Sequence, residues 1–182
     1  MLIQEITHEE NVRLLTHMHL GRLGCAQGAQ PYVVPISFVY NDNYLYSFAT
    51  VGQKINWMRA NPQVCVQTDR VVSDEEWVSL VIVGRYEELP DTPERKPDRE
   101  LAFQLLQQRA NWWEPGYAKT IVQHAERRLE PVYFRIQIDQ ITGLHGASEP
   151  TPGAELKRPA ELASSKHIRD IMASLRKKMF SA

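Results

Sequence analysis

The sequence has too few cysteines for a disulfide scaffold and no apolar run long enough to cross a membrane. Its two cysteines, Cys25 and Cys65, lie in separate apolar stretches outside any CxxC or Cys/His spacing, so we expect neither a disulfide framework nor a metal site. No run of about 18 apolar residues occurs, and residues 1–11 lack the basic start and apolar stretch of a signal peptide. We therefore expect a reduced, soluble, cytoplasmic protein with no membrane partner.

The net charge of the chain is also small, with a formal value of only -1. Residues 154–182 hold seven Lys or Arg against three Asp or Glu, whereas the preceding residues hold 14 against 19. Duplex binding depends on many cationic phosphate contacts, so an acidic body leads us to expect no nucleic-acid partner. The length of 182 residues predicts one domain with an appendage.

Sequence motifs of protein-based catalysis are missing. The six histidines form no HExxH pattern, and neither a GxSxG sequence nor a reactive cysteine context accompanies them. We interpret the histidines as solvated or capping residues, and the sequence offers no support for metal-dependent hydrolysis.

Hydrophobic periodicity predicts a mainly β (α+β) protein with flanking helices. Thr7 and Glu10 form a capping box before apolar residues at helical spacing. From Arg22 the period becomes two, and short polar turns favour antiparallel pairing and closure toward a barrel. The expected strands are 21–27, 31–40, 44–49, 63–72, 75–89 and 132–144. The expected helices are 8–19, 55–61, 100–110 and 117–129, with Leu101, Ala102 and Leu105 facing the core, and residues 91–99 are expected to form a loop.

The segment SFATVGQK, residues 47–54, has the composition of an anion-binding turn. It leaves a strand, passes through Gly52 and enters a short helix with Lys54 at its start. Backbone N–H groups at a helix N-terminus can hold an anion, and lysine adds a point charge for a phosphate. Ser47 and Thr50 add hydroxyl donors. An ordinary strand-to-helix turn with a solvated lysine has the same composition, so local chemistry alone leaves both interpretations open.

A longer block carries a family resemblance. Residues 21–89, in the order GRLGCAQ, PYVVPISFVY, YLYSFATVGQK, NPQVCVQTD and WVSLVIVGRYEEL, resemble the pyridoxamine 5'-phosphate oxidase-like, FMN-binding split-barrel family, particularly its flavin-nucleotide-binding and nitroimidazole-reductase-like members. A looser match continues through PVYFRIQIDQITG. The resemblance implies a six-stranded antiparallel split β-barrel of Greek-key type. It also implies a homodimer with one FMN in each of two clefts at the subunit interface.

The resemblance assigns roles to individual residues. The strand Val34, Pro35, Ile36 and Ser37 would lie along the isoalloxazine and offer backbone groups to its polar edge. The residues that would line the ribityl chain are Ser47, Phe48, Ala49 and Thr50. After Gly52, Gln53 and Lys54 match the two phosphate-holding positions, although Gln53 stands where the oxidases proper have arginine. Ser79 matches a polar position near the flavin on the neighbouring strand.

Structural roles remain open for several of these residues. Pro35 also fits an edge strand, and Ser79 also fits a buried serine bonded to its own strand. Trp112 and Trp113 form a candidate wall for a planar heterocycle or a partner subunit, and core packing is the alternative. His145 could reach the flavin from the partner chain or could be an ordinary turn residue.

These observations favour an FMN-dependent oxidoreductase that passes electrons from reduced FMN to a small acceptor. A non-catalytic flavin-binding or sensing module needs the same residues and stays open, as does haem binding through a histidine. The chain has no C-terminal arginine and histidine cluster after a matching strand, so we do not expect oxidation of vitamin B6 compounds.

The expected domain organisation has three parts. Residues 1–146 form the split-barrel domain, and residues 147–163, rich in Pro, Gly, Ala and Ser, form a linker. Residues 164–182 form an amphipathic basic helix that packs on its own or a partner subunit.

Overall fold

The computed structural model describes residues 2–108, 121–122, 125–126 and 131–147. The strands are β1 Leu2–Glu5, β2 Leu20–Gln27, β3 Gln30–Ser37, β4 Val39–Asn41, β5 Tyr44–Thr50, β6 Gln63–Ser73, β7 Glu76–Glu88, β8 Ile121–Val122, β9 Ala125–Glu126 and β10 Pro131–Ala147. The helices are α1 His8–Leu15, α2 Gln53–Ala60 and α3 Lys96–Gln107. None of the helices in these ranges combines the length and the apolar character that crossing a bilayer requires.

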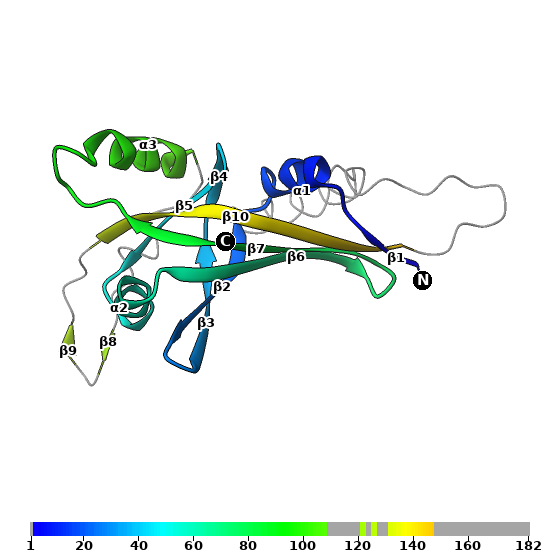
Figure 1. The fold of residues 1–182 in the computed structure, drawn as a ribbon, viewed down its shortest axis with the longest axis horizontal. Helices are drawn as coiled ribbons and strands as arrows, with labels where there is room; N and C mark the ends of the chain where they lie inside the picture. The colour runs from blue at the N-terminus through cyan, green and yellow to red at the C-terminus, as the bar shows by residue number, and fades with distance from the viewer. Residues whose placement is uncertain (1, 109–120, 123–124, 127–130, 148–182) are drawn as a thin grey trace, which may run out of the picture.

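One antiparallel sheet dominates the molecule. Its strand order is β3-β2-β6-β7-β10-β5-β4, and β1 pairs with β10. The first half of β10 lies between β5 and β7, and its second half lies between β1 and β7. Figure 1 shows β6, β7 and β10 running side by side, with α1 and α3 on one side of them and α2 on the other. The mainly β, split-barrel class is confirmed, but the sheet has eight strands instead of the expected six.

The extra strands arise where the chain changes its pairing partner. The expected strand 31–40 divides at Phe38, because β3 pairs with β2 and β4 pairs with β5. At this point the Phe38 N–H donates to the His19 carbonyl at 2.9 Å. The four residues of β1 become a strand through their pairing with the end of β10. Such pairings join segments distant in sequence, so local periodicity does not reveal them.

The helices begin or end at other residues than the periodicity predicts. Helix α1 ends at Leu15, before residue 19, because the N–H groups of His17 and Met18 bond three residues back and turn the chain toward β2. Helix α3 begins at Lys96, within the expected loop 91–99, because Pro97 lies in its first turn, where a missing N–H costs nothing.

Two expectations about the second half of the chain are wrong. Leu101 is exposed, whereas Ala102 and Leu106 face the core and Leu105 is half-buried. Within the expected helix 117–129, the described residues form the strand pair of β8 and β9 instead. Apart from Ala147 in β10, the expected linker 147–163 and helix 164–182 lie outside the described residues.

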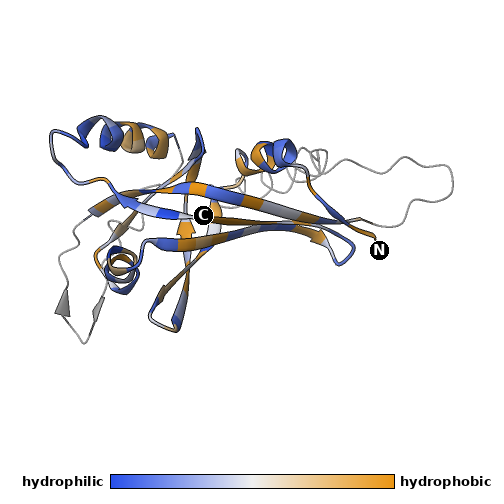
Figure 2. Cartoon of the chain, viewed as in Figure 1, coloured by the Kyte–Doolittle hydropathy of each residue, from blue (hydrophilic) through white to orange (hydrophobic). Residues whose placement is uncertain are grey.

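Two apolar clusters hold the elements together. The main core fills the space between the sheet, α1 and α2, with Leu15, Leu23, Ile55, Leu80 and Phe134 among its members. A second cluster lies where α3 covers β5 and β10, and its buried residues are Val39, Tyr46, Leu89, Ala102, Leu106 and Tyr133. Buried and more exposed residues alternate along much of β6 and β7, and Figure 2 shows hydrophilic as well as hydrophobic residues along the sheet. The sheet therefore has a second surface, away from the main core, on which binding residues can lie.

Candidate functional site

The expected anion-binding turn lies where β5 ends and α2 begins. Gly52 is the N-cap of α2, has extended backbone, and provides no side-chain cap. The first N–H groups of a helix have no partners within the helix. The N-terminus of α2 therefore offers backbone donors to an anion. We call these donors, with Gln53 and Lys54, the cradle.

Lys54 is partly buried in the first turn of α2. Burial lowers the pKa of its ammonium group from the usual 10.5, and the nearby Cys25 acts in the opposite direction with a smaller effect than burial. No carboxylate in the described part of the chain forms an ion pair with Lys54. A desolvated cation beside uncapped N–H groups fits a phosphate, which would supply the missing negative charge. The exposed Gln53 side chain adds only a neutral donor.

Pro35, Ser37 and Ser79 share one side of the sheet. This side, which we call the outer face, is the surface of β2, β3, β6 and β7 that points away from the main core. Arg22 pairs with Pro35, and Leu20 with Ser37. Residues opposite each other in a sheet point to the same side, whereas neighbours in sequence alternate. Val34 and Ile36 therefore point toward the main core, and they can offer a ligand only backbone groups.

A polar network at the centre of the outer face was not expected from the sequence. The Arg22 guanidinium donates to Gln67 Oε1 at 2.9 Å and to the Asp69 carboxylate. The Gln67 amide donates to Asp69 Oδ1 at 2.9 Å and to Ser79 Oγ at 3.2 Å. The network therefore orients Ser79 through a side chain of the adjacent strand. The signal for it was the polar residues Gln67 and Asp69 at alternate positions of β6, but only the strand register brings them together with Arg22 and Ser79.

Apolar side chains lie around this network. Six of them are 40–65% exposed, namely Leu20, Val33, Val71, Val81, Val83 and Leu144. A monomeric surface rarely presents so many apolar residues together, so this arrangement is typical of a surface that another molecule covers.

The residues expected to line a ribityl chain point in two directions. Ser47 is fully buried, and its hydroxyl donates to the Ser37 carbonyl at 2.7 Å. Ala49 also packs in the main core. Phe48 packs instead against the cluster beneath α3, and Thr50 lies on the same side of β5. Ser47 is thus not a free hydroxyl donor; it ties β5 to the edge strand β3.

His145 lies on the opposite side of the sheet from Ser79. It pairs with Val78, whose side chain is in the main core, whereas its neighbour Leu144 pairs with Ser79. The ring is 3% exposed, its Nε2 lies 3.1 Å from Gln4 Oε1, and its Nδ1 has no hydrogen-bond partner among the residues that the structure describes. His145 is therefore a buried residue of β10 and not the turn residue of the alternative interpretation, and its approach to a flavin stays a prediction. Trp112 and Trp113 lie outside the described residues.

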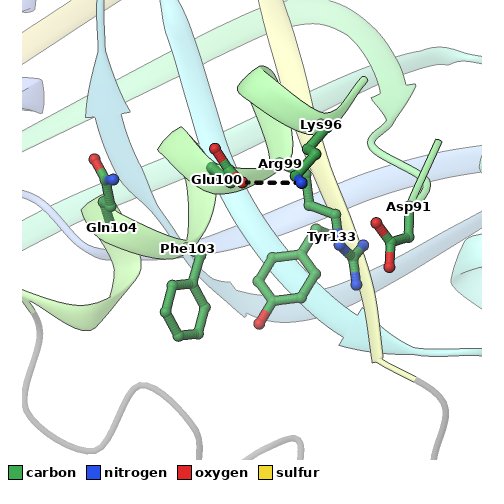
Figure 3. Close-up of a pocket in the computed structure, with 7 residues that line it drawn as sticks. All are labelled: Asp91, Lys96, Arg99, Glu100, Phe103, Gln104 and Tyr133. Atoms are coloured by element: carbon green, nitrogen blue, oxygen red, sulfur yellow. Dashed lines mark ion pairs between the residues drawn. The ribbon is translucent and has the colours of Figure 1, made fainter. Parts of the chain in front are cut away.

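A groove beneath α3 was also not expected from the sequence. Its volume is about 350 Å³, and its lining residues are Asp91, Lys96, Arg99, Glu100, Phe103, Gln104 and Tyr133. Figure 3 shows the rings of Phe103 and Tyr133 and the Arg99 guanidinium directed to the same side of the helix. In the described ranges, the groove included, no three His, Cys, Asp or Glu side chains gather to hold a metal ion.

Known proteins resemble the chain over most of its length. The model of the family described as pyridoxamine 5'-phosphate oxidase matches residues 7–145. The uncharacterized protein RA0666 of Rhizobium meliloti (strain 1021) is 38% identical over 143 residues, which are 79% of this chain and 95% of that protein.

Two solved structures are similar as well. A FAD-binding protein of Mesorhizobium loti is 40% identical with a TM-score of 0.66, over 81% of this chain and 99% of the other. A FAD-binding protein of Mycobacterium smegmatis is 20% identical with a TM-score of 0.55, over 81% and 100%, and shares the fold. The sequence match and the fold lead to one conclusion: the chain belongs to the pyridoxamine 5'-phosphate oxidase family.

Proposed function

We propose that the chain binds a flavin nucleotide and passes electrons from the reduced flavin to a small acceptor. The observation that carries the proposal is Lys54, a partly buried cation without a carboxylate partner among the described residues, beside the uncapped start of α2. The relative from Mesorhizobium loti, 40% identical over nearly its whole length, is named as FAD-binding. This supports a flavin as the ligand of the cradle.

The FMN moiety, which FMN and FAD share, would occupy both the cradle and the outer face. Its phosphate would be held by Lys54 and the N–H groups at the start of α2. Its ring system would lie against the outer face beside Pro35 and Ser79, where the edge strand β3 offers backbone groups. The flavin would supply the redox chemistry, and the chain would supply binding, orientation and exclusion of water.

A homodimer is part of the proposal. The apolar residues of the outer face need a cover, and a second copy of the chain would supply it on both sides of a two-fold axis. Each flavin would then be enclosed between the outer face of one subunit and its partner. The polar network around Arg22 lies within the same surface and would give the contact its register.

The absorption spectrum of the purified full-length chain tests the cofactor. Bands of oxidised flavin are expected, whereas a Soret band would favour haem instead. A colourless protein that rejects added flavin would overturn the proposal. Turnover with NAD(P)H or a nitroaromatic compound would separate an enzyme from a flavin-storing or sensing module.

Lys54→Met tests the place of the phosphate. The variant should bind FMN about tenfold or more weakly than the wild type, because one charge-assisted contact is lost. Its affinity for riboflavin, which has no phosphate, should not change. Arg13→Gln, which removes an exposed cation of α1, is the matched control and should alter neither affinity. Equal losses for FMN and riboflavin would place the phosphate elsewhere.

A further inference from the structure

We infer that the groove beneath α3 binds the adenosine half of FAD, so that the chain prefers FAD to FMN. The inference rests on the proposed function, because the FMN half of the same molecule would occupy the cradle and the outer face. It assigns a ligand to a part of the surface that FMN alone would leave unused.

The shape of the groove suits a planar ring. Phe103 and Tyr133 line it with ring centroids 6.5 Å apart at an interplanar angle of 64°. The Arg99 guanidinium carbon lies 4.5 Å from the centroid of the Tyr133 ring. In Figure 3 the Phe103 and Tyr133 rings and the Arg99 guanidinium are directed to the same side of α3. Tyr133 is buried beneath the guanidinium, whereas Phe103 is 40% exposed, so a nucleobase would stack on Phe103 and on the guanidinium plane. A volume of about 350 Å³ is within the range of small-molecule sites.

The charge of the groove favours a neutral ligand with hydroxyl groups over a free phosphate. Its two cations are already engaged, because Arg99 donates to the Leu89 carbonyl at 2.9 Å and Lys96 pairs with Glu100 at 4.0 Å. Asp91 forms no ion pair with any residue that the structure describes. Its carboxylate is an acceptor for the hydroxyls of a ribose, the partner that acidic side chains take in dinucleotide sites.

The groove and the cradle flank the same strand end. Phe48 of β5 packs against Tyr133 of the groove with centroids 6.0 Å apart, and Thr50 pairs with Pro131. Gly52 follows Phe48 by four residues, and an extended chain of that length spans at most about 14 Å. The diphosphate of FAD would bridge this corner, with its first phosphate at Lys54 and the adenosine under α3.

The affinities of the full-length chain for FAD, FMN and AMP test this inference. Flavin fluorescence quenching measures the first two, and equilibrium dialysis measures AMP. The wild type should bind FAD about tenfold or more tightly than FMN. Phe103→Ala should remove that preference and weaken AMP binding while FMN affinity stays constant. Leu101→Ala, an exposed apolar residue of α3 outside the groove, is the matched control and should change none of the three.

Each outcome decides between the two proposals. Equal affinity of the wild type for FAD and FMN, or equal losses for both flavins in Phe103→Ala, would overturn the adenosine site and leave the flavin site standing. AMP binding that depends on Phe103, in a chain that binds neither flavin, would support the groove and overturn the proposed function. Absence of binding by all three ligands would overturn both.

Discussion

Arg59 in the last turn of α2 donates two hydrogen bonds of 2.7 Å, from Nε and Nη2, to the carboxylate of Glu88 at the end of β7. The Tyr86 hydroxyl donates to the same carboxylate at 2.9 Å. Paired hydrogen bonds between a guanidinium and a carboxylate restrain orientation as well as distance. This contact therefore anchors to the sheet the same helix whose first turn carries Lys54.

Glu88→Gln should destabilise the protein. The variant keeps the shape of the side chain but loses the charge that Arg59 meets. The Arg59 side chain is 44% exposed, so solvent screens the pair and the expected loss in free energy of unfolding is about 1 kcal/mol. Urea denaturation measures it. Glu94→Gln, in the exposed loop before α3, should have no such effect, and a similar loss there would remove the special role of Glu88.

The contribution of Glu88 should disappear in acid. The hydrogen bonds from Arg59 hold the pKa of Glu88 below its usual 4.5. The contact stabilises the fold fully above that value and loses its effect as the pH falls through the lower pKa of the folded protein. The stability difference between wild type and Glu88→Gln should thus be constant near neutral pH and shrink below pH 4.5. A difference that persists undiminished in strong acid would contradict the ionic contact.

Flavin phosphate binding should weaken at alkaline pH. Burial lowers the pKa of Lys54 from 10.5, so the free protein loses this charge at a lower pH than an exposed lysine would. FMN affinity should fall as the pH rises toward 10.5, whereas Lys54→Arg, whose guanidinium stays charged, should bind with little dependence on pH in this range. Titrations of both proteins with FMN measure the difference. Parallel pH profiles would show that another group titrates.

Val81→Asp should separate the proposed homodimer into monomers. Val81 is 40% exposed at the centre of the outer face, opposite Gln67 and Thr142. A carboxylate buried there against its own copy would lack a partner. Analytical ultracentrifugation measures the mass, and Leu101→Asp on α3 should leave the mass unchanged. Wild-type protein that sediments as a monomer would refute the dimer itself.

Gly84→Ala should break the packing between β7 and β10. The added Cβ would overlap the Gln137 carbonyl oxygen and would lie 2.9 Å from Ile136 Cγ2. Backbone cannot move aside in the middle of a sheet, so we expect a loss of about 1–3 kcal/mol or more in the free energy of unfolding. At Gly52 the nearest atom to a Cβ is 3.9 Å away, so Gly52→Ala should retain its stability. Thermal denaturation of both variants compares them, and equal stabilities would refute the clash.

Part of the candidate site was predictable because it is local. Gly52 and Lys54 are two residues apart, and a helix that starts between them produces the cradle wherever the helix packs. The alternation along residues 44–50 similarly predicts a strand. The alternation does not tell which side of the strand faces the core. Ser47 is on the buried side, where its hydroxyl donates to the Ser37 carbonyl and is not available to a ligand.

The rest of the site depends on pairings between distant segments. Arg22, Gln67 and Ser79 become a network only because β2, β6 and β7 are neighbours in one register. Tyr133 and Phe103 line one groove because α3 covers β5 and β10. The His145 side chain lies in the interior of the subunit because its partner in the register is the core residue Val78, whereas its neighbour Leu144 points to the opposite side of the sheet.

The scarcity of cysteine and of long apolar runs and the period-two segments indicated the class of fold, because each follows from composition or local order. The motifs from Gly21 to Leu89 carried a resemblance to the family, which the match of the family model then showed. The tertiary structure decided which side of each strand meets the core, where α3 begins and what it covers, and which polar side chains meet. Side chains in a sheet alternate strictly, so one register places a residue in the core or on the binding surface, and that register is set by strands far apart in the sequence.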